Sequence, residues 1–70
     1  MDKKDVEKSL EARGFKKDGT VYKNYSMETG KYEATINEDC SIFLKYYFQK
    51  TGYKGDRMFT NVQEFERLWD

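Results

Sequence analysis

The stretch that decides the fold is Ser41-Ile42-Phe43-Leu44-Lys45-Tyr46-Tyr47-Phe48-Gln49, the longest run of aromatic and branched residues in the chain. Such residues favour β-strands, so we expect residues 41–49 to form the central strand of a sheet. Successive side chains of a strand point to opposite faces. The row expected in the core is Ile42, Leu44, Tyr46 and Phe48. The row expected on the other face is Phe43, Lys45 and Tyr47.

The segments before this stretch predict two further strands. Residues 31–37 alternate between apolar and polar side chains, which is typical of a strand with one buried face. Residues 20–27 are polar and aromatic, and their facing is ambiguous because both rows contain a large apolar residue. We favour the inward row Val21, Lys23, Tyr25 and Met27, which places Tyr22 on the uncovered face. The loop at residues 28–31 is expected to turn at Gly30, which can adopt a positive φ.

The two ends of the chain predict helices. Residues 2–13 are rich in helix-forming residues and stop at Gly14. Residues 60–69 carry apolar side chains at intervals of three and four, and Asn61 with Glu64, or Thr60 with Gln63, has the spacing of a capping box. Between the central strand and this helix, residues 53–59 contain Gly55 and predict a loop or a short fourth edge strand.

The order of these elements predicts the fold class. We expect one α+β domain over residues 1–70, built as a helix, a three- or four-stranded antiparallel meander and a second helix. Both helices are expected on one face of the sheet, because a sheet of this size must bury one face against another layer.

The composition argues against catalysis and metal binding. The chain has no histidine, which removes the commonest general base and the commonest metal ligand. Cys40 is the single cysteine, so no disulfide can form within the chain, and we expect its side chain to be half-buried rather than reactive. The glycines lie outside any phosphate-binding motif. We therefore expect no enzyme activity, no cofactor and no metal.

Charge and hydropathy limit the partners. Thirteen basic and thirteen acidic residues cancel, which argues against a protein that holds a polyanion by bulk charge alone. Basic residues nevertheless dominate residues 41–60, where four of them stand against Asp56 alone. No apolar run approaches the roughly 20 residues of a membrane span, and the first residues are charged. We expect a cytoplasmic protein without membrane contact.

Two parts of the chain resemble known families. Leu10-Glu11-Ala12-Arg13-Gly14-Phe15, followed by a polar hairpin and further strands, resembles in layout the small HicA-type toxin ribonucleases, which have a double-stranded-RNA-binding-like fold. Their chemistry depends on a histidine that this chain lacks, so this resemblance implies topology alone. Residues 32–69, with a Gly-Tyr-Lys-Gly turn and a short amphipathic helix, look like the arm-binding domain of phage integrases, which lays a three-stranded sheet against DNA. That resemblance implies DNA contacts by Lys45, Tyr47, Lys54 and Arg57.

The row Phe43, Lys45 and Tyr47 carries the functional prediction, because two helices cannot easily cover both faces of a sheet in 70 residues. Large exposed rings among charged residues are typical of protein-binding surfaces. We expect a non-enzymatic interaction module, such as a phage or mobile-element factor that binds and inhibits or otherwise modulates a host or cognate protein. The predicted partner-binding residues are Phe43, Lys45, Tyr47, Tyr22, Lys50, Lys54 and Arg57.

Three alternatives stay open. In the first, the rings and Tyr22 pave the face for stability alone, with Lys45 lying across a ring. In the second, the protein binds nucleic acid: Phe43 and Tyr47 stack on bases, and the basic side chains of Lys45, Lys50, Lys54 and Arg57 contact phosphates. In the third, a homodimer buries the same face.

Overall fold

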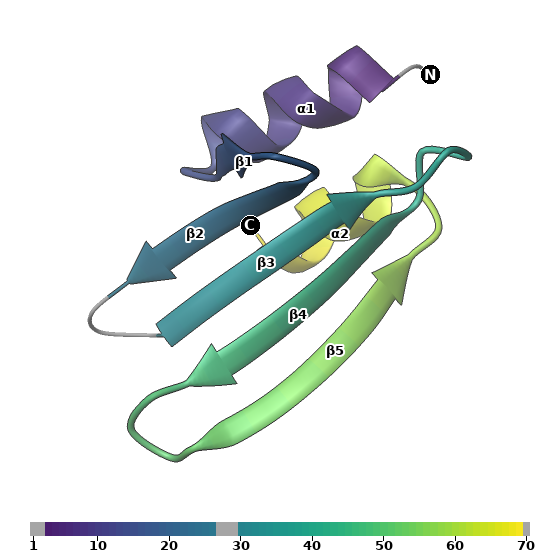
Figure 1. Ribbon diagram of the computed structural model, residues 1–70. Coiled ribbons are helices and arrows are strands. Elements are labelled where there is room, and N and C mark those ends of the chain that lie inside the picture. Colours follow the sequence, from purple (N-terminus) through teal and green to yellow (C-terminus); the bar gives the residue numbers. More distant parts are fainter. Residues whose placement is uncertain (1–2, 27–29, 70) are drawn as a thin grey trace.

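The structure is a computed structural model that describes residues 3–26 and 30–69. Within these residues, five antiparallel strands form one sheet in the order β1-β2-β3-β4-β5, with a helix before and a helix after them (Figure 1). The elements are α1 (Lys3–Ala12), β1 (Lys16–Asp18), β2 (Val21–Ser26), β3 (Gly30–Ile36), β4 (Ile42–Phe48), β5 (Tyr53–Phe59) and α2 (Val62–Trp69).

The α+β class and the order helix, meander, helix are confirmed, but the predicted count of three or four strands is wrong. The additional strand is β1, whose sequence Lys-Lys-Asp has no strand preference of its own. It forms because the chain turns back tightly at Gly19, which has φ +67°, so that Asp18 pairs with Val21. An ion pair of 2.7 Å between Lys23 Nζ and Asp18 Oδ2 joins the two strands. Residues 53–59, predicted as a loop or a short strand, form a full edge strand.

Both helices pack on one face of the sheet, where the core lies. Cross-strand partners share a face, so the pairs Tyr22 with Ala34, Ala34 with Leu44, and Ile42 with Phe59 define the covered side. In Figure 1, α2 lies behind the sheet on this side. The buried apolar residues of the described chain are Val6, Leu10, Phe15, Tyr22, Ala34, Ile42, Leu44, Phe59, Val62 and Phe65.

The predicted facing of β2 is wrong. Tyr22 is only 3% exposed and lies in the core, whereas Val21, Lys23 and Tyr25 lie on the uncovered face. The register explains the difference, because Tyr22 stands opposite Ala34, whose small side chain leaves room for a ring. Met27, assigned to the same row, and residues 28 and 29 of the predicted loop lie outside the described residues. Gly30 has φ +125°, which confirms the predicted positive φ.

Burial changes the chemistry of the Tyr22 hydroxyl. Its oxygen is buried and has no well-formed hydrogen bond to any described residue. Burial raises the pKa of Tyr22 to about 12, and the nearby Glu7 carboxylate adds to this shift through a loose hydrogen-bonding approach to the hydroxyl and through its negative charge. The hydroxyl is therefore neutral at physiological pH and contributes a desolvation cost to the core.

A polar cluster joins α1 to α2. Ser9 is 8% exposed, and its hydroxyl donates to Glu66 Oε2 at 2.6 Å. The same hydroxyl accepts a hydrogen bond of 2.9 Å from Arg13 Nη1, which also lies 3.5 Å from Glu66 Oε2. The three side chains satisfy one another across the interface between the helices, so they fix how α2 sits beside α1.

The start of α2 shows one half of the capping box predicted for Asn61 and Glu64, and the Glu64 carboxylate bonds to the amide of Thr60 rather than to that of Asn61. The side-chain oxygen of Asn61 accepts a hydrogen bond of 2.9 Å from the Glu64 amide. The Glu64 carboxylate in turn accepts one of 3.1 Å from the Thr60 amide. Hydrogen bonding by Thr60 holds the pKa of Glu64 below its usual value. The bond from the Glu64 amide satisfies a donor that the first turn of the helix leaves unpaired, and the bond from the Thr60 amide fixes the chain just before the helix.

Candidate functional site

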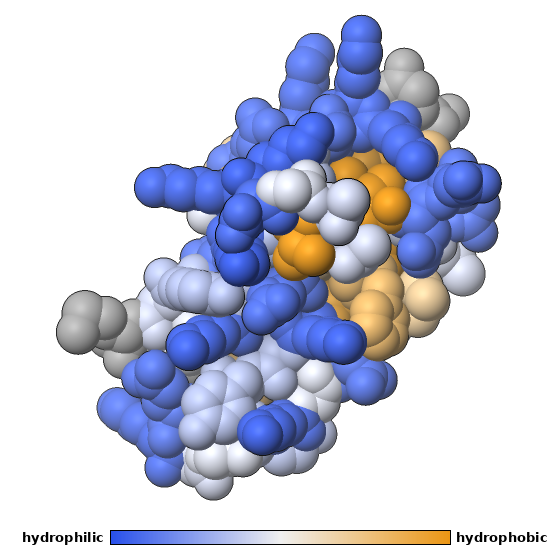
Figure 2. Space-filling view, in the orientation of Figure 1, coloured by the Kyte–Doolittle hydropathy of each residue, from blue (hydrophilic) through white to orange (hydrophobic). Residues whose placement is uncertain are grey.

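The face of the sheet opposite the helices carries most of the residues on which the predicted function depends. Phe43 and Tyr47 of β4 are half-buried there and Lys45 is exposed. In the ladder, Lys45 stands between Glu33 of β3 and Asp56 of β5. We call this surface the open face. In Figure 2, which views the sheet from this side, the surface is mainly hydrophilic, with hydrophobic area toward the turn between β3 and β4.

One row of the open face consists of charged residues. The register places Lys16, Lys23, Glu33, Lys45 and Asp56 in line from β1 to β5. Opposite charges on neighbouring strands stabilise each other by a few tenths of a kcal/mol to about 1 kcal/mol per pair. The acidic residues therefore divide the positive charge of this row, and no continuous basic stripe forms along it.

The next row alternates rings and lysines. It consists of Tyr25, Lys31, Tyr47 and Lys54 on successive strands. Lys31 Nζ lies 5.5 Å from the Tyr25 ring centroid, and Lys54 Nζ lies 5.7 Å from the Tyr47 ring centroid. Such cation–π contacts are worth about 0.5–1 kcal/mol at exposed sites. They hold the rings in fixed positions while leaving Tyr25 53% exposed.

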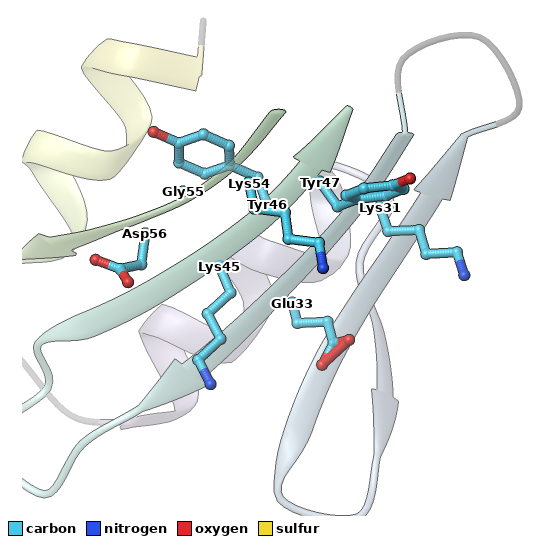
Figure 3. Close-up of a pocket in the computed structure, with 8 residues that line it drawn as sticks. All are labelled: Lys31, Glu33, Lys45, Tyr46, Tyr47, Lys54, Gly55 and Asp56. Atoms are coloured by element: carbon cyan, nitrogen blue, oxygen red, sulfur yellow. The ribbon is translucent and has the colours of Figure 1, made fainter. Parts of the chain in front are cut away.

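These two rows border a shallow depression of about 560 Å³. Figure 3 shows its lining, with the Tyr47 ring beside the Lys31 and Lys54 side chains, and with Lys45 and Glu33 extending from neighbouring strands. The lining residues are Lys31, Glu33, Lys45, Tyr46, Tyr47, Lys54, Gly55 and Asp56. The depression is an open surface with charged groups around rings rather than an enclosed chamber.

The structure brings together some of the predicted site residues and separates others. Phe43, Lys45, Tyr47 and Lys54 share the open face. Tyr22 does not, because it is buried beneath the helices, and its predicted exposure is corrected here.

Two further predicted residues also lie elsewhere. Lys50 is exposed in the loop that joins β4 to β5. Arg57 stands opposite Leu44, so it belongs to the helix side of the sheet. Tyr25 was missed as a site residue because its strand was assigned the opposite facing.

A second surface, on the helix side, was not predicted. It is a groove of about 550 Å³ lined by Asn24, Ser26, Tyr32, Leu44, Tyr46, Phe48, Arg57, Leu68 and Trp69. Beside it, the rings of Tyr46, Phe48 and Tyr53 stack on one another with centroids 5.4–5.9 Å apart and interplanar angles of 22–29°. We call this surface the aromatic groove.

The aromatic groove is open because the helices are shorter than the strands. At about 1.5 Å per residue, the 8 residues of α2 span roughly 12 Å, whereas the 7 residues of β4 span roughly 23 Å. The end of α2 places Trp69 against Tyr32, with ring centroids 4.9 Å apart. Beyond this contact the helix side of the sheet is uncovered, and Tyr53 is 54% exposed.

The placement of Tyr46 and Phe48 differs from the expectation that they lie in the core, since both are half-buried. A hydrogen bond with the Tyr53 hydroxyl, together with partial burial, raises the pKa of Tyr46. The helix and strand lengths read from the sequence are the signal that could have revealed this groove.

Within residues 3–26 and 30–69, no three side chains of the metal-binding types come together where they could hold an ion. Neither helix in the described part of the chain is both long and apolar enough to cross a membrane.

Comparisons of this chain with protein-family models, with curated proteins and with solved structures gave no match.

Proposed function

We propose that this protein is a small non-enzymatic module that binds another protein through its open face. The observation that carries the proposal is that three rings, those of Tyr25, Phe43 and Tyr47, lie on a sheet face that no described helix covers, each with a lysine amine within about 6 Å. Aromatic anchors that are already held in place lose little entropy when they are buried against a partner.

The charge pattern supports a protein partner rather than a polyanion. Glu33 and Asp56 stand on either side of Lys45 in the ladder, so a phosphate backbone across this row would meet carboxylates as well as amines. A protein surface can match alternating charges with its own alternating charges. The expected partner surface is therefore apolar at its centre with charges of both signs around it.

The proposal extends to the biological setting. A prepared binding surface in a sequence without histidine suits a phage or mobile-element factor that inhibits or otherwise modulates a host or cognate protein. Such a factor needs no chemistry of its own, because occupying a surface of the target is enough.

The test compares two tyrosines that point to opposite sides of neighbouring strands. Tyr47→Ala removes a ring from the open face, and Tyr53→Ala removes one from the aromatic groove. Each variant and the wild type are immobilised and used to capture proteins from a host lysate, and each captured protein is then purified and titrated. We expect at least tenfold weaker binding with Tyr47→Ala and unchanged binding with Tyr53→Ala, with matching circular dichroism spectra. Unchanged binding with Tyr47→Ala would contradict the proposal.

Nucleic-acid binding is the second candidate, and one observation favours it. Lys23, Lys31, Lys45 and Lys54 all project from the open face near rings. Bases could stack on these rings while the amines contact phosphates. This candidate predicts affinity that falls steeply with salt. An anisotropy titration with labelled single- and double-stranded oligonucleotides at low salt that shows no binding up to about 10⁻⁴ M would exclude it.

A further inference from the structure

The outer edge of β5 is the longest unpaired edge in the described part of the sheet. Strand order places β5 at one end and β1, of only three residues, at the other. In Figure 1 β5 runs along the border of the sheet with no element beside it. Its residues Tyr53, Lys54, Asp56, Arg57 and Met58 are all exposed. An edge strand of this kind presents backbone donors and acceptors to which another strand can pair.

The simplest strand that can pair with this edge is the same strand of a second copy. Along β5, the backbone groups of every second residue point outward, away from β4. In a twofold antiparallel pair, odd-numbered residues must therefore stand opposite odd-numbered residues, and even-numbered opposite even-numbered. This condition leaves a small set of registers. We name each register by the residue that lies on the twofold axis opposite its own copy. The registers differ in which charged residues stand opposite each other.

Charge distinguishes the registers that are centred in the middle of the strand, from Lys54 to Arg57. Centring the pair on Lys54, on Asp56 or on Arg57 places two identical charges opposite each other on the axis. Centring it on Gly55 places Lys54 of each copy opposite Asp56 of the other, which makes two attractive pairs on the open face. In the same register Tyr53 of each copy stands opposite Arg57 of the other on the helix side, an arrangement suited to a cation–π contact.

We propose that the chain forms a twofold dimer through antiparallel pairing of β5 with β5 of a second copy, centred on Gly55. The inference does not rest on the proposed function, because it concerns self-association through the strand edge, although Lys54 and Asp56 also border the open face. The dimer joins two sheets into one, so each open face and each aromatic groove lies next to its counterpart. One strand pair is small compared with the roughly 1,200–2,000 Å² buried in stable complexes, so the dimer dissociates on dilution.

The test uses charge exchange at the two residues that face each other. In Lys54→Glu, the new Glu faces Asp56 of the other copy twice. In Asp56→Lys, Lys54 faces the new Lys twice. Each variant alone should self-associate at least tenfold more weakly than the wild type in sedimentation equilibrium over a concentration series. An equimolar mixture of the two variants should recover association, because each copy then meets the opposite charge at both pairs.

Two controls separate this interface from others. Lys16→Glu changes the charge of the open face on β1, at the opposite edge of the sheet from β5, and should leave self-association unchanged. Amide hydrogen exchange should show protection of alternate amides in β5 that grows with protein concentration. Wild-type protein that stays monomeric up to millimolar concentration would overturn the proposal. So would variants that associate as the wild type does, or a mixture that associates no better than its components.

Discussion

The ring of Tyr46 lies directly on the backbone of Gly55, its partner across the ladder between β4 and β5. A Cβ atom at Gly55 would lie 2.7 Å from Cε2, Cζ and Oη of that ring. Glycine is therefore the residue that lets Tyr46 lie flat enough to stack with Phe48 and Tyr53.

We expect Gly55→Ala to displace the Tyr46 ring and disturb this stack. The ring is half-buried and its far end can move, so the loss of stability should be modest, about 1 kcal/mol. Near-ultraviolet circular dichroism reports the change in tyrosine environment. In a Tyr46→Ala background, Gly55→Ala should be neutral or stabilising, since alanine loses less backbone entropy than glycine. An equal loss in both backgrounds would contradict this account.

Gly30→Ala should be far more damaging. A Cβ atom there would lie 2.0 Å from the carbonyl oxygen of Tyr47, and Gly30 has φ +125°. Because the obstacle is the backbone of the neighbouring strand, no rotamer change relieves it, and we expect a loss of about 3 kcal/mol or more in urea unfolding. Gly19→Ala is the matched control, with φ +67° and no atom within 4 Å of the added Cβ. It should cost only about 1 kcal/mol.

Tyr22→Phe should be neutral or stabilise the fold by up to about 1 kcal/mol, because the buried hydroxyl lacks a well-formed hydrogen bond. The pH dependence follows from the pKa of Tyr22, which is raised from 10.0 to about 12. The unfolded chain releases this proton at lower pH than the folded one, so stability is full below pH 10 and is lost as pH rises toward 12. The two-unit difference corresponds to roughly 2–3 kcal/mol.

The comparison of Tyr22→Phe with the wild type in urea unfolding at pH 7 and pH 11 checks both points. Between pH 7 and pH 11, the free energy of unfolding should fall less for the variant than for the wild type. Some fall remains in the variant, because the pKa of Tyr46 is also raised. A variant that is clearly less stable at pH 7 would show that the hydroxyl makes a favourable hydrogen bond.

Ser9→Ala should weaken the contact between α1 and α2. It removes the hydroxyl that donates to Glu66 and accepts from Arg13, and it leaves these groups without that partner. We expect a loss of about 1 kcal/mol in thermal or urea unfolding. A double-mutant cycle with Glu66→Ala should give a coupling energy clearly above zero. Additive effects of the two substitutions would show that the hydrogen bond contributes little.

The elements that could be read from the sequence are those with a strong internal pattern. The apolar spacing of Val62, Phe65 and Trp69 defines α2, and the aromatic run after Ser41 defines β4. In contrast, β2 has a large apolar side chain in each of its rows, so its facing depends on the partner strand, where Ala34 leaves room for Tyr22. The strand β1 has no pattern at all and exists because a turn returns the chain to β2.

Some residues of the candidate site could likewise be predicted from the sequence, and others could not. The open-face residues of β4 could be identified because alternation along one strand fixes which side chains share a face. Lys31 could also be assigned to that face, from the alternation of its own strand. Tyr25 could not, because the facing of its strand depends on the register with β3. The lengths of α2 and β4 indicate that part of the sheet stays uncovered, but which part becomes the aromatic groove depends on where α2 packs, and no single segment determines that.

Because α1 and α2 are shorter than the strands, the sheet has a covered part and an uncovered part, and we expect the two to differ in local stability. Where the helices cover it, around Ala34 and Ile42, an amide can exchange with solvent only after the layers separate. At the hairpin end, from Tyr46 to Gly55, both faces already meet water, so a local opening exposes little additional apolar area. We therefore expect the amides of this end to exchange with solvent faster than those of the covered half.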